Sequence, residues 1–540
     1  MEDFRSIQEF SLLSPEYHGN YSDLSESTVN DLSLHFLIQH LSDSETERQI
    51  LKMILLKMPI DCKIIAYRQE VYQDLKRNPE LCESLREIFD AIQFSSIDDT
   101  HMSYSKASIW ELMERLRTLE QYCQAIAKIQ ELLEGKQFQS RGMQQFSGFI
   151  RQIYQNSGFS ELSKDIEILS DDIMSIKSMT LGINFNTEFA PSEIGIVSLN
   201  SYAFSEKGFL EKFLQFHRKR HPEDKNLTPF TMLSHAGNGT ASESLLMNNL
   251  TNLVEEMLPT ITTKLRRTLK RYTDRSGTAL AHLGDELLFY FSFIRLEERL
   301  KEAGFPCHLM TFSENETHLS DFYNIRLALC QLDGTVKNHI VCNPLNFTQE
   351  QTILILTGCN QGGKTIFTQG IGLAFLLAQH GVFAPCSGGT LRICDGIYTH
   401  FPADENETVS LGRLGEEAVR FREICSMATK ESLLLFNESF ATTSHTESLY
   451  IAENSLKYLC CLGARTCFNT HMHELAMHPD SLKTEQAICG AVSLVMGKRD
   501  GKEAYHIRYE PPEGLSYAYD IAKQYGITFE QLYQEHLHQD

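Results

Sequence analysis

The chain has 540 residues, 42% of them hydrophobic and 22% charged, a composition typical of soluble globular proteins with roughly two to four domains. No apolar stretch is long enough to predict a membrane span, and the N-terminal residues lack the basic and apolar regions of a signal peptide. The 14 cysteines contain no C-x-x-C pair, so reduced thiols in a cytoplasm are expected rather than a disulfide framework.

The formal net charge of −22 argues against a general affinity for nucleic acids, because Lys and Arg make the contacts to phosphate groups. Any binding to DNA would have to come from local basic patches. The charge bears on partners and solubility and does not restrict the fold.

The N-terminal part of the chain is expected to be helical. Residues 1–30 are polar with few apolar anchors and are predicted to form a weakly packed arm. From Leu32 the apolar residues take helical spacing, and amphipathic helices are predicted over 64–75 and 81–92. A long helix with a heptad-like apolar stripe is predicted over 109–133, and 146–169 continues in the same manner. Helices this long suggest levers or arms, although an ordinary helical bundle fits the periodicity equally well.

The middle of the chain combines a hairpin with basic clusters. Residues 179–200 alternate apolar and polar side chains around Pro191, which predicts a β-hairpin. A short predicted helix over 209–216 leads into a first basic cluster, and a very long helix is predicted over 250–300. Both segments offer positive charge for a phosphate backbone, although most charge runs are solvated helix faces. The candidate residues are Arg218, Lys219 and Arg220 in the first cluster, and Lys264, Arg267, Arg271 and Arg275 along one face of the long helix.

Short strands are predicted at 308–311, 325–332 and 340–342. From about residue 346 strands and helices alternate, as in a parallel α/β sheet.

The stretch 352–365 reads TILILTGCNQGGKT and contains the pattern G-x-x-x-x-G-K-[ST]. Between a buried strand and a helix, this pattern is typical of a phosphate-binding loop. The backbone N–H groups of such a loop face the phosphates, its lysine reaches the outer phosphates, and its threonine hydroxyl binds Mg²⁺. The sequence therefore predicts that ATP or GTP binds at the start of the following helix. The predicted nucleotide ligands are Gly358, Cys359, Asn360, Gln361, Gly362, Gly363, Lys364 and Thr365.

A second apolar strand, 433–436, ends at Asn437 and Glu438. Phosphoryl-transfer sites commonly place one acid there to hold Mg²⁺ and a second carboxylate to position the attacking water. Glu438 is the candidate for the second role, whereas Asn437 is a neutral replacement for the first and weakens the case for fast turnover. His471 follows a strand predicted at 466–470 and is a candidate contact to the γ-phosphate.

Four stretches resemble the ATPase domain of the MutS family of DNA mismatch-repair proteins. They are TGCNQGGKT, residues 369–385, SLLLFNESFATTS and NTHMHEL, which are similar to the family's TGPNMGGKS loop, its helix ending in G-x-x-V-P-A, its D-E-x-G-x-G-T-S box and its T-H-x-x-E-L box. Upstream, residues 32–75 resemble the start of the family's helical core. Residues 181–200 and the helix at 250–300 resemble its clamp-proximal hairpin and returning lever.

The resemblance implies a mixed fold. An N-terminal all-α core and lever domain with a small β-containing clamp-like insertion would precede a C-terminal α/β ABC-type P-loop ATPase domain. The expected boundaries are the polar arm at 1–30, the core and lever region at 31–305 with the insertion at about 175–250, connecting strands at 306–345, and the ATPase domain with its dimer-supporting helices at 346–540.

The resemblance also implies a function. The family's ATPases use ATP and Mg²⁺, form their two nucleotide sites at a dimer interface, and pass the nucleotide state to a DNA clamp. A homodimer that binds double-stranded or branched DNA is therefore expected. Asn343 matches the family's asparagine that contacts the nucleotide base, and residues 514–527 resemble the segment that ends in a dimer-supporting helix.

Several departures limit what the resemblance supports. The chain leaves no room for the N-terminal mismatch-reading and connector domains, and Asn437 replaces the family's Walker B aspartate. Phe440, Ala441 and Thr442 replace the glycines and arginine after Glu438, and Gly412–Glu417 lacks the serine of the S-T-F signature. An ATP-gated protein–protein scaffold, or a weakly hydrolysing pseudo-ATPase without DNA binding, is therefore the alternative interpretation.

Overall fold

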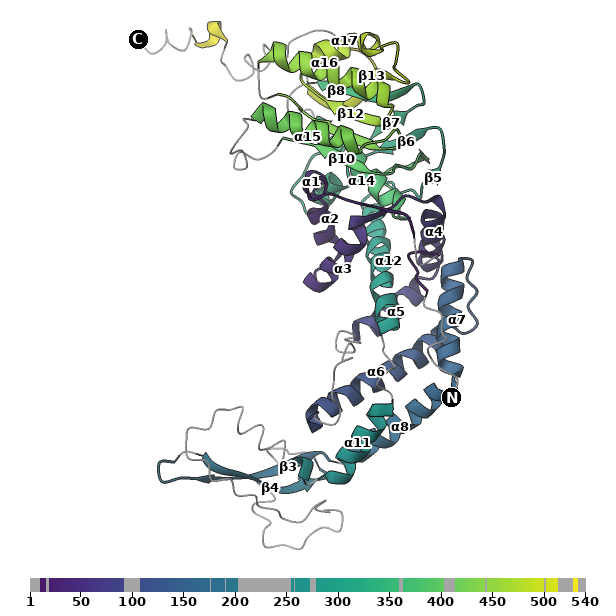
Figure 1. The fold of residues 1–540 in the computed structure, drawn as a ribbon, viewed down its shortest axis with the longest axis vertical. Helices are drawn as coiled ribbons and strands as arrows, with labels where there is room; N and C mark the ends of the chain where they lie inside the picture. The colour runs from purple at the N-terminus through teal and green to yellow at the C-terminus, as the bar shows by residue number, and fades with distance from the viewer. Residues whose placement is uncertain are drawn as a thin grey trace. The chain divides into compact units, whose positions relative to one another are not determined.

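The computed structural model describes residues 10–15, 19–91, 107–174, 176–189, 191–202, 254–256, 258–271, 278–358, 363–402, 413–441, 444–499, 502–512 and 528–532. The fold is rich in helices and contains both parallel and antiparallel sheets (Figure 1). Internal contacts divide it into two compact units. The first unit holds the described residues within 80–137 and 144–284, and the second holds those within 10–79, 138–143 and 285–540.

The first unit consists mainly of helices and one hairpin. Its elements are most of α5 (Pro79–Ala91), α6 (Ile109–Leu133), most of α7 (Arg141–Gln155), α8 (Ser157–Met174), β3 (Ser178–Phe185), β4 (Pro191–Asn200) and α11 (Pro259–Arg271). Helix α6 has the predicted bounds. The Ser108 side chain accepts from the Glu111 N–H, and the Glu111 carboxylate accepts from the Ser108 N–H at 2.6 Å, which together form a capping box. The buried positions of α6 include most of the predicted apolar stripe.

Two segments of this unit that were each predicted as one helix differ from the prediction. Residues 146–169 do not form one helix, because α7 ends at Gln155 and α8 begins at Ser157. Between them the Asn156 side chain accepts from the Gly158 N–H at 2.8 Å and so caps the start of α8. The long helix predicted over 250–300 is seen as α11 and α12 (Thr278–Glu302), and residues 272–277 lie outside the described part.

The predicted hairpin is confirmed. Strands β3 and β4 pair antiparallel from Ser178 opposite Asn200 to Phe185 opposite Pro191. At its base, Ile196 and Leu199 pack with Ile109 and Val254 in a small buried cluster.

The second unit begins with a compact N-terminal segment. Its elements are β1 (Tyr21–Asp23), α1 (Glu26–Asp31), α2 (Leu34–Leu41), α3 (Glu45–Leu56), β2 (Lys57–Pro59) and α4 (Cys62–Lys76). The expectation of a weakly packed arm is wrong for the described residues after 9. Leu12 is fully buried. Its N–H donates to the Glu286 carboxylate at 2.6 Å, and its carbonyl accepts from the Tyr290 hydroxyl at 2.7 Å.

A four-stranded sheet of order β5-β9-β6-β7 follows in this unit. Its strands are β5 (Thr311–Phe312), β6 (Thr317–Phe322), β7 (Asn343–Phe347) and β9 (Gly388–Leu391). Residues 325–332, predicted as a strand, instead form the helix α13 (Ile325–Leu332). The Asn324 side chain caps this helix by accepting from the Arg326 and Leu327 N–H groups. The strand predicted at 340–342 is wrong, because the strand of this region, β7, begins only at Asn343. Of the strand predicted at 308–311, only Thr311 belongs to β5, and His308 makes an isolated bridge to Ala384.

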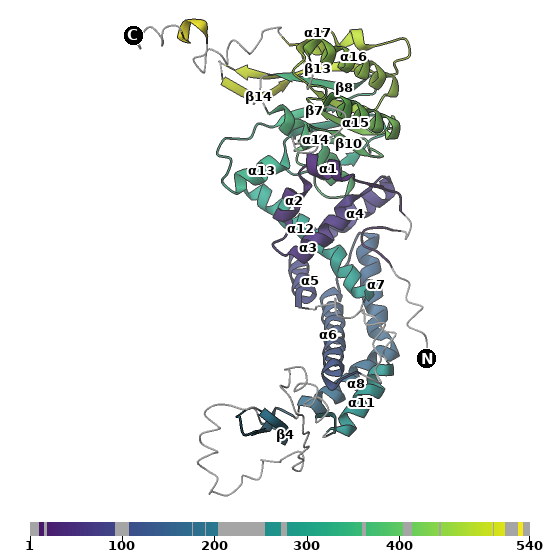
Figure 2. The ribbon, with the colours of Figure 1, turned by 60° about the vertical axis from the view of Figure 1, so that its left-hand side comes forward.

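The central sheet has six strands in the order β10-β11-β12-β8-β13-β14. They are β8 (Gln351–Gly358), β10 (Ile397–His400), β11 (Leu433–Asn437), β12 (Arg465–Asn469), β13 (Gly490–Arg499) and β14 (Lys502–Arg508). All neighbours are parallel except β13 and β14, and β14 forms one edge (Figure 2). The alternation of strands and helices thus builds the predicted parallel α/β sheet, with one antiparallel strand added.

Helices cover both faces of this sheet. Helix α14 (Lys364–Gln379) packs on one face against β8, β11 and β12. On the other face, α15 (Arg413–Met427), α16 (His445–Leu462), α17 (His473–Met477) and the 3₁₀ helix η3 (Pro479–Leu482) enclose a core with Ile353, Ile355, Leu434, Phe436 and Phe468. No helix among the described residues is both long enough and apolar enough to cross a membrane.

The Gly372→Ala substitution tests the packing of α14. A Cβ at this position would lie 2.5 Å from Leu32 Cδ2 and 2.9 Å from Leu435 Cδ1, and both leucines are fully buried. Overpacking of this kind costs about 1–3 kcal/mol of folding free energy, so we expect a lower unfolding temperature in differential scanning calorimetry.

The matched control is Gly148→Ala in α7, where an added Cβ has no neighbour within 4 Å. Alanine is favoured over glycine inside a helix by about 1 kcal/mol, so the control should be neutral or stabilising. Equal effects of the two substitutions would contradict the packing argument.

Candidate functional site

The candidate site lies where β8 ends and α14 begins. Strand β8 is buried between β12 and β13 and ends at Gly358, whose φ is 145°. A Cβ on Gly358 would lie 2.7 Å from the Met496 carbonyl oxygen, so the strand can end in this way only with glycine. Gly363, with a φ of 84°, directly precedes α14. The predicted ligands Cys359, Asn360, Gln361 and Gly362 lie outside the described residues.

Lys364 is the first residue of α14 and is only 4% exposed. Its Nζ donates to the Gly358 carbonyl oxygen at 3.1 Å. The ammonium group therefore lies between the end of β8 and the start of α14, where a helix N-terminus favours anions.

A polar cluster joins three elements beside this lysine. The Thr365 hydroxyl donates to Asn437 Oδ1 at 3.0 Å, and the Asn469 side-chain amide donates to the same oxygen. Asn437 and Asn469 end β11 and β12 and are paired in register, which explains why they meet. Asn469 was not singled out from the sequence. Its position at the end of the strand next to β11 is the signal that could have identified it.

The cluster suits Mg²⁺ by the chemistry of its atoms. Thr365 and Asn437 offer neutral oxygens, and Asn469 Oδ1 is a buried oxygen without a hydrogen-bond partner among the described residues. Mg²⁺ prefers oxygen ligands and usually keeps several waters together with substrate phosphates. Among the residues that the structure describes, no group of three or more His, Cys, Asp or Glu is arranged to hold a metal. These neutral oxygens fit Mg²⁺ only together with the charge of a bound phosphate.

Glu438 and His471 form the next pair. His471 Nε2 lies 2.7 Å from Glu438 Oε1, and both side chains are partly exposed. The Glu438 backbone has a φ of 52° and donates its N–H to the Asn469 carbonyl at 2.9 Å. The hydrogen bond from His471, with the charge of Lys364 adding to it, lowers the pKa of Glu438. The carboxylate is therefore held ionised and fixed next to the Asn437 cluster.

The segment after Glu438 is fixed by α15. The Phe440 N–H donates to the Glu417 carboxylate at 2.7 Å, and Phe440 has a φ of 65°. His400 contacts the Ser439 hydroxyl at 2.7 Å, and burial lowers the pKa of His400 to about 4, so its ring is neutral at physiological pH. Residue Gly412 of the expected signature lies outside the described part, and α15 begins at Arg413.

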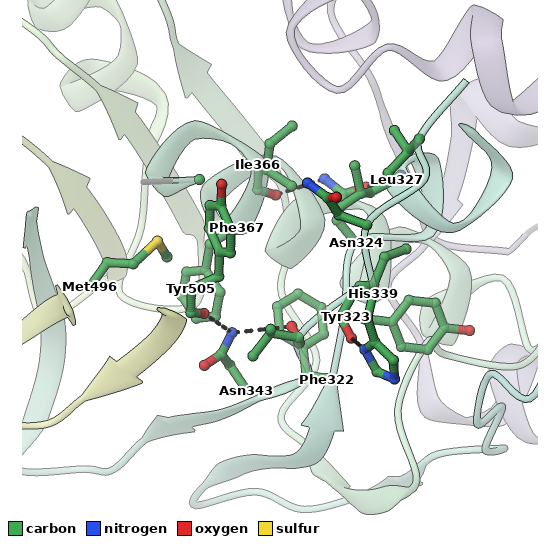
Figure 3. Close-up of a pocket in the computed structure, with 15 residues that line it drawn as sticks. Phe322, Tyr323, Asn324, Leu327, His339, Asn343, Ile366, Phe367, Met496 and Tyr505 are labelled. Carbon is green, nitrogen blue, oxygen red and sulfur yellow. Dashed lines mark hydrogen bonds between the residues drawn. The ribbon is translucent and has the colours of Figure 1, made fainter. Parts of the chain in front are cut away.

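A cavity of about 240 Å³ opens beside Gly363 (Figure 3). Its walls are largely apolar and come from β6, α13, the segment before β7, α14, β13 and β14. Asn343 lines it, but both ends of its amide are engaged within the protein. Nδ2 donates to the Tyr505 carbonyl at 3.0 Å, and Oδ1 accepts from the Ile507 N–H at 2.7 Å.

Two family models match the chain. The model described as MutS domain V matches residues 354–529, and the model described as the MutS2 N-terminal domain matches residues 60–303. The chain belongs to the MutS family.

Curated relatives named DNA mismatch repair protein MutS are similar over 29% to 35% of the chain. The Chlorobium chlorochromatii protein is 38% identical over 157 residues, 29% of this chain and 18% of the relative. The Alkaliphilus oremlandii protein is 30% identical over 184 residues, 33% of this chain and 20% of the relative. The Geobacillus thermodenitrificans protein is 28% identical over 189 residues, 35% of this chain and 20% of the relative. The matched stretch thus spans about a fifth of each of these relatives.

The basic residues predicted to contact DNA belong to the region that matches the MutS2 N-terminal domain. Lys264 and Arg267 lie on α11 and are exposed. Arg271 ends that helix, and Arg218, Lys219, Arg220 and Arg275 lie outside the described residues. The neighbouring Arg266 is engaged, since it donates to the Glu255 carboxylate at 2.9 Å and to the Ala107 carbonyl at 3.0 Å. The MutS segment expected to support a dimer, 514–527, is also outside the described part.

Proposed function

We propose that this chain is an ATP-binding, DNA-associated ATPase switch, in which nucleotide-driven closure of a homodimer changes the grip on double-stranded or branched DNA. The observation that carries the proposal is the meeting of Lys364, Thr365, Asn437, Glu438 and His471 at the carboxyl ends of β8, β11 and β12. Ligands of open parallel α/β sheets bind at this end of the strands.

Each residue has a role that follows from its position. Lys364 would bind the outer phosphates of ATP at the start of α14. Thr365, Asn437 and Asn469 would hold Mg²⁺, which when bound offsets the negative charge of the phosphates. Glu438 would accept a proton from the attacking water, and His471 would turn from Glu438 toward the γ-phosphate. Gly358 to Gly363 would surround the phosphates with backbone N–H groups.

Turnover is proposed to be slow. A carboxylate at position 437 would add a full negative charge to the metal site, and asparagine adds none. Binding of Mg²⁺·ATP without rapid hydrolysis suits a switch that remains closed for a long time, because closure then ends only when the nucleotide is hydrolysed or leaves.

The predicted domain division remains part of the proposal. A helical core and lever region at 31–305 with a clamp-like insertion would carry Lys264 and Arg267 toward DNA, and the ATPase domain at 346–540 would dimerise. The cytoplasmic location also stays a prediction. The comparisons favour DNA-associated function and lend no support to the alternative of a protein–protein scaffold.

The test is a mobility-shift assay with plain, mismatched and branched duplexes, with and without Mg²⁺·ATP, over a range of salt concentrations. Phosphate contacts make the logarithm of affinity fall linearly with the logarithm of salt concentration. Replacing both Lys264 and Arg267 with alanine should reduce that slope by about 2, because each lost contact removes about one unit.

The control replaces Lys128 and Lys136, exposed residues of the same unit, and should leave the slope unchanged. Failure of all three duplexes to bind at low salt would overturn the DNA part of the proposal while leaving ATP binding intact.

A further inference from the structure

We infer that Glu417 is a positioning residue for hydrolysis, because it fixes the backbone turn that presents the Glu438 carboxylate to the attacking water. The inference rests on the proposed function, since Glu417 has this role only if Glu438 acts on a bound nucleotide.

The turn at the end of β11 has a backbone conformation that its residues disfavour. Glu438 has a φ of 52° and Phe440 a φ of 65°, both in the left-handed region that bulky residues rarely occupy. Such a backbone persists only where surrounding contacts impose it, and it is concentrated at functional sites. The direction of the Glu438 side chain therefore depends on the contacts that hold Ser439 and Phe440.

The Glu417 side chain holds this turn directly. Its carboxylate, on α15, accepts from the Phe440 N–H at 2.7 Å, two residues beyond Glu438. A carboxylate is a stronger acceptor than a neutral oxygen. On the other side of the turn, the Glu438 N–H donates to the Asn469 carbonyl at 2.9 Å. The two hydrogen bonds thus fix the backbone before and after Ser439.

A second connection runs through His400, the last residue of β10, against which α15 packs. His400 Nε2 lies 3.2 Å from the Glu417 carbonyl oxygen, and Nδ1 lies 2.7 Å from the Ser439 hydroxyl. A carbonyl oxygen only accepts, so in the neutral ring Nε2 carries the proton and Nδ1 accepts from Ser439. The main chain of Glu417 is thus linked to Ser439, and its side chain is bonded to Phe440.

The other contacts of Phe440 act on its ring and its carbonyl. The ring is 1% exposed and its centroid lies 5.3 Å from that of Phe421, while the carbonyl accepts from the Ser448 hydroxyl at 2.6 Å. The N–H bound by Glu417 is the group of Phe440 nearest to Glu438 along the chain. Loss of that bond would let the peptide between Ser439 and Phe440 rotate, and the Glu438 carboxylate would shift while Phe440 stayed packed.

The test compares two replacements of Glu417 that have nearly the same length. Glu417→Gln keeps an oxygen that accepts from the Phe440 N–H, whereas Glu417→Met offers only a weak thioether acceptor. In single-turnover hydrolysis of Mg²⁺·ATP, Glu417→Met should lower the rate about tenfold to a hundredfold, because a misplacement of about 1 Å can cost about a hundredfold. Glu417→Gln should stay within about threefold of the wild type, since a neutral acceptor makes a weaker bond.

Both variants should bind Mg²⁺·ATP with the wild-type Kd in isothermal titration calorimetry, because the loss lies in the chemical step. Glu423→Met changes an exposed glutamate of the same helix and is the matched control, which should leave the rate unchanged. In the Glu438→Gln background, Glu417→Met should add nothing, because a positioning residue has no effect once the group it positions is gone. A purely structural role would weaken ATP binding and would add to the effect of Glu438→Gln.

If Glu417→Met does not fold, Ser439→Ala takes its place. This substitution removes only the hydroxyl that His400 binds, and it should lower the rate without changing the affinity for ATP. The inference is overturned if the folded variant hydrolyses ATP like the wild type, if Glu417→Gln loses as much as Glu417→Met, or if the loss persists in the Glu438→Gln background.

A wild type that binds Mg²⁺·ATP without hydrolysing it also overturns the inference, because Glu438 then has no reaction for which it must be positioned. The ATP-binding part of the proposed function stands in that case. A wild type that does not bind ATP overturns the proposed function itself, so the two failures are distinguishable.

Discussion

Lys364→Ala is expected to reduce ATP affinity at least about a hundredfold. Lys364 is 4% exposed, and its ammonium group donates to the Gly358 carbonyl at the point where phosphates would reach the N-terminus of α14. A hydrogen bond to a charged group contributes about 1.5–3 kcal/mol, and one lysine can reach two phosphate oxygens. Isothermal titration calorimetry with Mg²⁺·ATP measures the loss directly. Inorganic tripolyphosphate, which carries the phosphates without the sugar and base, should lose affinity in parallel.

The control for this result must remove a lysine without touching the site. Lys430→Ala removes a side chain that is 70% exposed in the same unit and should leave ATP affinity unchanged. The unfolding temperature of Lys364→Ala without nucleotide should not fall by much, because the substitution removes a buried charge. Stabilisation by added ATP, which depends on the ratio of ligand concentration to its dissociation constant, should disappear. ATP affinity within threefold of the wild type would contradict the assignment of the phosphate-binding loop.

The elements that were predicted well are those whose signals are local. Helix α6 has the predicted bounds because the long apolar stripe that marks it lies in contiguous sequence. Strand β8 and helix α14 could be placed because a glycine-rich loop joins an apolar run to a helical one. In each case the residues that identify the element lie within it or directly beside it in the sequence.

The elements that were predicted wrongly depend on distant contacts or on a single side chain. Residues 325–332 are apolar and short, a pattern that fits a buried strand as well as a helix. The Asn324 side chain caps the segment and thereby favours the helix. The same side chain is held in place by a hydrogen bond from its Nδ2 to the Ile366 carbonyl at 2.6 Å. The backbone of Leu12 is held by hydrogen bonds to Glu286 and Tyr290, which lie more than 270 positions further along the chain. The burial of Leu12 could therefore not be predicted from the residues around it.

The candidate site divides in the same way. The motifs predicted that five residues would act together, and the structure brings them to the carboxyl ends of β8, β11 and β12. These residues are Lys364, Thr365, Asn437, Glu438 and His471. Asn469 joins them through the parallel register of β11 and β12, which no motif encodes. Tyr505 lines the neighbouring cavity and comes from β14, which pairs antiparallel with β13 and whose place in the sheet could not be predicted from the spacing of residues.

Glu438→Gln is expected to lower kcat of ATP hydrolysis by about 10²–10⁴-fold while leaving the affinity for Mg²⁺·ATP nearly unchanged, since a general base acts only in the chemical step. The bond from His471 lowers the pKa of Glu438, so the carboxylate stays ionised below the ordinary pKa of a glutamate. Activity that requires this carboxylate should therefore persist as the pH falls, until the pH passes below the lowered pKa. His471→Ala removes the bond and should move the acidic limb of the kcat/KM profile to higher pH.

A steady-state ATPase assay over a range of pH tests both substitutions. The matched control is Glu453→Gln, a partly exposed residue of α16 that pairs with Lys457 away from the cluster, and it should leave the profile unchanged. Measurable wild-type turnover that survives Glu438→Gln would exclude Glu438 as the base. Negligible turnover in both forms, with ATP still bound, would instead mean that the neutral Asn437 leaves a switch that closes on ATP without hydrolysing it. Asn437→Asp should then restore turnover, because it returns the missing negative charge to the Mg²⁺ site beside Lys364 and Thr365.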